Sequence, residues 1–192
     1  LNTFAQYTRT VINMVLSLYT IRLVLGTLGE ADYGIYSLIA GVVAMLGFIT
    51  NSLVATTQRF ISYYQGKGDL FKTKEVFNNS LVIHVFLGIL IVLVLEFISP
   101  LLFNGFLNIP HDRIYAANTI YHCVVLILLT TFLAAPFKAL LVSHENIVYI
   151  SIIEILECVL KVFLVVSMTY YDSDKLIYYG YIMLVIQIFS FL

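Results

Sequence analysis

Six long apolar stretches occupy most of this 192-residue chain, and they constrain its fold more than any other feature. A helix that crosses the hydrocarbon core of a membrane needs about 20 mostly apolar residues, and five of the stretches reach that length. The sixth is still apolar at Leu192, so we expect its helix to continue beyond that residue. The stretches are residues 4–28, 35–57, 76–102, 114–135, 147–170 and 176–192.

The composition and the form of these stretches point to membrane-spanning helices. Hydrophobic residues make up 61% of the chain and charged residues 11%, whereas an ordinary soluble domain is about 25% charged. Peptide groups in lipid must be satisfied within the chain, and continuous apolar runs lack the alternation of a membrane β-barrel. We therefore predict an all-α, polytopic integral membrane bundle of about six helices over residues 1–192. Gly41, Gly47 and Gly88 lie inside the runs and predict close helix contacts.

The loops between the runs differ in their lysine and arginine content. The second and fourth loops hold five of these residues, and the other three loops hold two. Short cytoplasmic loops are enriched in Lys and Arg, so we predict that these two loops and the N-terminus are cytoplasmic. The five are Arg59, Lys67, Lys72 and Lys74 in residues 58–75 and Lys138 in residues 136–146, and the other two are Arg113 and Lys175.

Three charged residues lie deep inside the fifth run. Glu154, Glu157 and Lys161 are separated by three, four and seven positions, which places them along one face of a helix. Glu157 and Lys161 are in the favourable order for an ion pair four residues apart. Two interpretations stay open: a self-neutralising stripe that orients the helix in the bundle, or one wall of a polar translocation cavity.

Other polar residues inside the runs allow two interpretations each. Arg22 lies near the end of the first run, where it either extends to the lipid headgroups or faces a cavity, and Glu96 is similarly ambiguous. We expect His84 to be a hydrogen-bonded core residue rather than a metal ligand. Asn13 and Asn51 are expected to form hydrogen bonds between helices.

The chain carries no catalytic signature. GxSxG, GxxxxGK[ST] and HExxH are all missing from the sequence, and the loops are too short for a catalytic domain. Cys123 and Cys158 lie inside apolar runs and are expected to be small buried residues. We predict a transporter rather than an enzyme, with no cofactor, no metal site and no nucleic-acid partner.

Four segments together resemble the Wzx-type polysaccharide or O-antigen flippases of the MOP superfamily. Residues 21–39, IRLVLGTLGEADYGIYSLI, are similar to the family's first loop and second helix, and residues 59–69, RFISYYQGKGD, to the cytoplasmic end of that helix. Residues 108–118, NIPHDRIYAAN, and residues 135–161, APFKALLVSHENIVYISIIEILECVLK, resemble one bacterial branch of the family.

This resemblance implies a bacterial inner-membrane transporter built of two helical lobes, of which this chain is the N-terminal one and the C-terminal lobe a missing partner. Its substrate would be an undecaprenyl-diphosphate-linked oligosaccharide for lipopolysaccharide or capsule, moved by alternating access. Arg22 and Lys161 would contact the diphosphate, and Glu96, Glu154 and Glu157 would bind a coupling ion or serve as charge partners. Glycosyltransferases and a glycan polymerase are further implied partners.

Two other functions remain open at this stage. A MATE-type cation-coupled multidrug exporter would share the fold, and it would favour acidic over basic cavity residues. A non-transporting membrane scaffold or an oligosaccharide polymerase belongs to a different class, although a polymerase should carry a large periplasmic loop.

Overall fold

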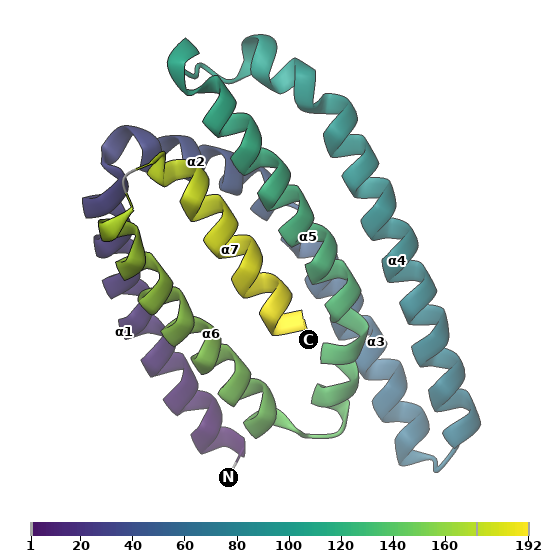
Figure 1. The fold of residues 1–192 in the computed structure, drawn as a ribbon. Coiled ribbons are helices and arrows are strands. Elements are labelled where there is room, and N and C mark those ends of the chain that lie inside the picture. Colours follow the sequence, from purple (N-terminus) through teal and green to yellow (C-terminus); the bar gives the residue numbers. More distant parts are fainter. Residues whose placement is uncertain (1, 172, 192) are drawn as a thin grey trace.

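The computed structural model describes residues 2–171 and 173–191, and the regular structure of these residues is entirely helical (Figure 1). This confirms the predicted all-α membrane bundle. Short 3₁₀ or π turns, Leu102–Phe106, His111–Arg113 and Met168–Tyr170, adjoin the longer helices. The α-helices are α1 Asn2–Leu28, α2 Glu30–Ala44, α3 Gly47–Gly66, α4 Leu70–Leu101, α5 Ile114–Ser143, α6 Ile147–Ser167 and α7 Lys175–Phe191.

Helices α1, α4 and α6 run in one direction along the bundle and α3, α5 and α7 run in the other, with α2 leading into α3 across a short break (Figure 1). One end, here called the N-terminal end, holds the start of α1 and the turns that join α3 to α4 and α5 to α6. Among the described residues, four segments are long and apolar enough to cross a membrane: residues 6–28, 30–66, 70–101 and 111–143. A helix of 32 residues such as α4 is about 48 Å long, so it extends beyond a hydrocarbon core of about 30 Å.

The helix boundaries differ from the apolar boundaries at several places. The run 35–57 is interrupted at Met45 and Leu46, between α2 and α3, and the predicted loops 58–75 and 136–146 shrink to turns of a few residues. Pro136 lies inside α5. Hydrophobicity ends where the lipid headgroups begin, whereas the backbone hydrogen bonds of a helix continue into water, so the apolar parts of α3, α4 and α5 are shorter than these helices. Leu192, the last residue of the sixth run, lies outside the described residues.

Two tight turns depend on glycine. Gly29 joins α1 to α2 with φ of 80°, and Gly68 joins α3 to α4 with φ of 73°. Residues with a Cβ rarely adopt this left-handed conformation, and glycine adopts it without steric cost. Asp69 then caps α4 by accepting a hydrogen bond from the backbone N–H of Lys72 at 3.0 Å.

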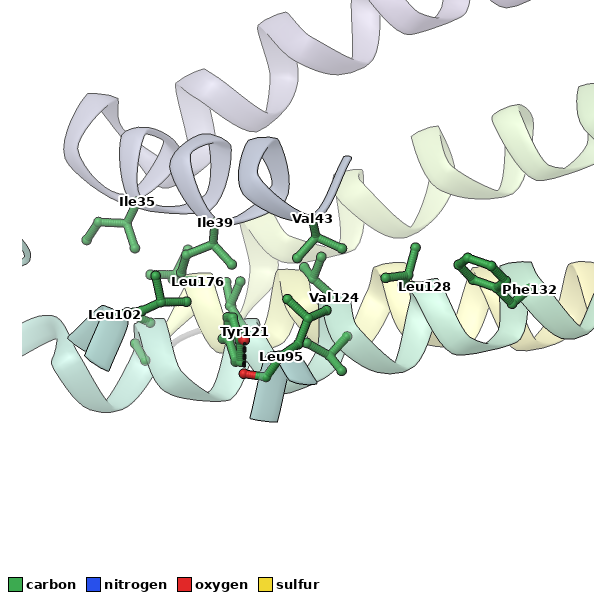
Figure 2. Close-up of a cluster of buried hydrophobic side chains, with 14 residues drawn as sticks. Ile35, Ile39, Val43, Leu95, Leu102, Tyr121, Val124, Leu128, Phe132 and Leu176 are labelled. Carbon is green, nitrogen blue, oxygen red and sulfur yellow. Dashed lines mark hydrogen bonds between the residues drawn. The ribbon is translucent and has the colours of Figure 1, made fainter. Parts of the chain in front are cut away.

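Helix α5 is the centre of the hydrophobic core. It packs against α2, α3, α4 and α7, and it is the most buried of the long apolar helices. Figure 2 shows Val124, Leu128 and Phe132 of α5 together with Ile39 of α2 in this core. The Tyr121 hydroxyl, also on α5, donates a hydrogen bond to the backbone carbonyl of Leu95 at 2.6 Å, which satisfies the buried phenol (Figure 2).

The three glycines that predicted close helix contacts behave differently. A Cβ added to Gly88 of α4 would lie 3.0 Å from the Cβ of Phe132 on α5, so this glycine does allow a close approach. Cβ atoms added to Gly41 or Gly47 would meet nothing within 4 Å. The prediction is therefore right for Gly88 and wrong for Gly41 and Gly47, which lie beside the break between α2 and α3.

An ion-pair cluster fastens the end of the bundle opposite the N-terminal end. Arg113 donates to Asp32 of α2 through Nε at 2.9 Å and through Nη2, and to Asp174 through Nη1 at 2.9 Å. Asp174 also accepts a hydrogen bond from the backbone N–H of Leu176 at the start of α7, at 3.0 Å. One guanidinium therefore joins three segments that are far apart in the sequence.

Replacing Gly88 by leucine should destabilise the bundle, because the larger side chain meets the fixed backbone-proximal part of Phe132. We expect a loss of about 1–3 kcal/mol. Thermal unfolding in detergent can be followed by the reaction of buried Cys123 with a thiol-reactive dye in a Cys158→Ser background. Gly41→Leu is the matched control and should leave the transition temperature nearly unchanged; an equal loss in both variants would contradict the close α4–α5 contact.

Replacing Arg113 by glutamine should also lower thermal stability, by about 1–3 kcal/mol, because two partly buried carboxylates lose their shared cation. The same dye-reaction assay measures the thermal stability of this variant. Lys175→Gln is the matched control. Lys175 is a cation at the same end of the bundle, and it makes no ion pair within the described part of the chain. Equal stability of the Arg113 variant and the wild type would show that the cluster does not hold this end together.

Candidate functional site

A cavity of about 640 Å³ lies inside the bundle. Helices α1, α2, α3, α5, α6 and α7 all contribute to its wall. Many of the lining side chains are polar although the surrounding helices are apolar, which is typical of a space that admits water or a polar ligand. The polar lining residues are Asn13, Ser17, Thr20, Tyr33, Tyr36, Thr50, Asn51, Thr131, Lys138, Glu154, Glu157, Lys161, Tyr179, Gln187 and Ser190.

The charged stripe of α6 forms one wall of this cavity. Glu154, Glu157, Cys158 and Lys161 all line it, as their spacing on one helical face requires. Each of the four is half-buried. The stripe therefore lies in a cavity wall, which is the position that the second of its two interpretations requires.

Glu154 lies between two cations from other helices. One of its carboxylate oxygens is 3.3 Å from Nη1 of Arg9 on α1, and the other is 3.3 Å from Nζ of Lys138 on α5. The exposed fractions of the three side chains are 28% for Glu154, 19% for Arg9 and 56% for Lys138. This cluster carries two positive charges and one negative charge, and it connects three helices.

The ion pair expected between Glu157 and Lys161 is not formed. Glu157 instead accepts a hydrogen bond from the hydroxyl of Ser190 on α7. Lys161 makes no ion pair with any residue that the structure describes. The packing of α7 against α6 brings Ser190 to the carboxylate, and Lys161 is left as a cation in the cavity wall with no acidic partner there.

Two uncharged polar groups of the cavity wall also lack partners. Asn13 Oδ1 and Thr50 Oγ1 are buried and accept no hydrogen bond within residues 2–171 and 173–191. Buried polar atoms in proteins are nearly always hydrogen-bonded, so these two oxygens are suited to a polar ligand or to water. Asn13 and Asn51 were expected to join helices, and both line the cavity instead.

Two other predicted site residues lie away from the cavity. Arg22 is exposed on α1 and is not part of the cavity wall, which favours its alternative contact with lipid headgroups. Glu96 on α4 pairs with His122 on α5, its Oε1 lying 3.0 Å from Nδ1 of the histidine, and neither residue lines the cavity. His84 is buried and bonded to the Ser80 carbonyl at 2.7 Å, as expected of a core histidine.

Sequence reasoning missed two residues of the cluster. Arg9 lies inside the first apolar run and received no role, and Lys138 was placed in a loop because α5 was expected to end before it. A usable signal was present for Lys138: it and Glu154 lie at equal distances in sequence from Asn146, so an antiparallel helix pair that turns there brings them together. Tyr33, Tyr36 and Tyr179 line the cavity as well.

The fold is that of a polytopic membrane bundle with a polar cavity, and a comparison with known families gives the class of protein. The model of the MatE family matches residues 8–166, and the chain belongs to this family. MatE family members are membrane transporters of the MOP superfamily. No curated protein and no solved structure matches the chain.

The cavity predicts that the two cysteines differ in reactivity. Cys158 lines the cavity, whereas Cys123 is 4% exposed in the core. Because thiol modification depends on access, a water-soluble maleimide should label Cys158 at least about tenfold faster than Cys123. Labelling rates of the Cys158→Ser and Cys123→Ser variants, read by mass spectrometry in detergent, check this; equal rates would contradict a water-accessible cavity.

Proposed function

We propose that this chain is part of a transporter that moves an undecaprenyl-diphosphate-linked oligosaccharide from the cytoplasmic to the outer leaflet of a bacterial inner membrane. The observation that carries the proposal is Lys161, a half-buried cation in the cavity wall that has no acidic partner among the described residues. A cation in this position is suited to an anionic group that has to cross the membrane.

The electrostatic argument rests on the cost of moving charge through a low-dielectric layer. A diphosphate carries its charge into a region where unpaired charges are strongly disfavoured. Lys161 lies about 20 Å along α6 from its first residue and about 10 Å from its last. An ammonium group here lowers the barrier for the diphosphate, and the unpartnered oxygens of Asn13 and Thr50 offer acceptors to sugar hydroxyls.

The proposed orientation places the N-terminal end of the bundle in the cytoplasm. The cations nearer this end, Arg9, Arg59, Lys67, Lys72, Lys74 and Lys138, outnumber those nearer the opposite end, Arg22, Arg113, Lys161 and Lys175. This is the distribution that positive residues show between cytoplasmic and outer loops. The cavity would therefore receive its substrate from the side on which Arg9, Lys138 and Glu154 lie.

The test is a Lys161→Gln substitution in the protein that carries this chain, reconstituted in liposomes with a fluorescent undecaprenyl-diphosphate sugar. The flipping rate should fall about tenfold or more, corresponding to at least ~1.4 kcal/mol of lost stabilisation. Arg22→Gln, outside the cavity, is the matched comparison and should have a much smaller effect. Unchanged flipping in the Lys161 variant, at equal protein incorporation, would refute the proposal.

One observation favours a second candidate, a cation-coupled multidrug exporter. The Glu157 carboxylate lines the cavity and contacts Ser190, with no cation paired to it in the described part of the chain. The same liposomes distinguish the two functions: transport of a quaternary ammonium dye that Glu157→Gln abolishes and Lys161→Gln spares would support the exporter.

A further inference from the structure

The cluster of Arg9, Lys138 and Glu154 lies at the N-terminal side of the cavity. Lys138 and Glu154 both line the cavity, and Arg9 contacts it through Glu154. Arg9 and Glu154 lie about two turns from the first residues of α1 and α6, and Lys138 lies about one and a half turns from the last residue of α5. Glu154 and Lys161 are both on α6, and about 10 Å of helix separates them. The cluster and Lys161 are therefore two separate positively charged positions along one cavity.

The cluster joins two parts of the bundle that otherwise pack little against each other. Helix α6 packs mainly on α1 and α7 and only slightly on α5, while α5 packs on α2, α3, α4 and α7. The contact of Lys138 with Glu154, at 3.3 Å, connects α5 to the α1–α6 pair across the cavity. Arg9 belongs to the α1–α6 side, so the two cations approach the same carboxylate from opposite sides.

The charges of the cluster do not balance. Each oxygen of Glu154 meets one cation, and one positive charge is left over. A phosphate group offers more oxygens and more negative charge than a carboxylate, and arginine binds it through two parallel hydrogen bonds. The pair of Arg9 and Lys138 is therefore better matched to a phosphate than to the single carboxylate that lies between them.

We propose that Arg9 and Lys138 form a phosphate-capture site at the cytoplasmic side of the cavity, and that Glu154 occupies it until the diphosphate of the substrate displaces the carboxylate. This inference rests on the proposed function, because it takes the ligand to be a diphosphate. The carboxylate keeps the two cations from repelling each other in the empty cavity and excludes weakly binding anions. Displacement breaks the Lys138–Glu154 contact between α5 and α6 and passes the diphosphate toward Lys161.

The experiment uses the purified chain in detergent and inorganic pyrophosphate as the probe, with binding measured by calorimetry at low ionic strength. Glu154→Gln removes the competing carboxylate while keeping its size, so pyrophosphate should bind about tenfold more tightly than to the wild type. Lys138→Gln removes one cation and should weaken binding about tenfold. Glu157→Gln is the matched control, because this carboxylate lines the same cavity without contacting a cation among the described residues.

The outcomes separate this inference from the proposed function. Unchanged or weaker binding by Glu154→Gln, or equal tightening by Glu154→Gln and Glu157→Gln, overturns the capture site. If Lys161→Gln abolishes pyrophosphate binding while Glu154→Gln has no effect, the proposed function stands and the capture site falls; if the wild type and all variants fail to bind, both fall. Helix content by circular dichroism checks folding. If Glu154→Gln does not fold, Glu154→Asp, with its shorter reach, should tighten binding to a smaller extent, and no tightening by it overturns the site.

Discussion

The hydrocarbon core of a membrane contains no water to solvate a peptide group or a charge, and this one constraint accounts for most of what the structure contains. Backbone groups are satisfied inside helices, and several hydroxyls, such as those of Thr20 and Ser151, bond the carbonyl four residues earlier on their own helix. Charged side chains have no such local solution. They lie at the helix ends, in ion pairs or on the cavity wall.

Two ion clusters illustrate how the same chemistry serves different purposes. At one end, Arg113 is held by the two carboxylates of Asp32 and Asp174, and its donors are well satisfied by acceptors. At the other, Glu154 is shared by two cations and has fewer oxygens than they have donors. The first arrangement suits a permanent fastening of three segments. The second leaves positive charge that a phosphate can use, and it lies on the cavity wall toward the N-terminal end of the bundle.

The family match concerns the class of transporter, and the side chains of the cavity wall concern the charge of its substrate. The MatE match over residues 8–166 shows a transporter of the MOP superfamily, and it does not distinguish a lipid-linked oligosaccharide from a drug. The side chains of the wall address that question. Lys161 and the capture site favour an anionic substrate, whereas Glu157 is the residue on which a cationic substrate would depend.

The sequence by itself determined the helical class, the approximate spans and the face of α6 that carries charge, because hydrophobicity and helical spacing are local properties. It also identified Gly88, Gly41 and Gly47 as equivalent candidates for close packing, and only the tertiary structure separated them, since the difference lies in what a neighbouring helix places opposite each one. The same holds for the charges. Spacing along α6 favoured a pair between Glu157 and Lys161, but α7 brought Ser190 to Glu157, and α1 and α5 brought Arg9 and Lys138 to Glu154. Which charge is neutralised and which is left in the cavity depends on contacts between helices. The spacing along α6 does not encode these contacts, and only the Lys138–Glu154 pair, which flanks the turn at Asn146, has a signal in the sequence.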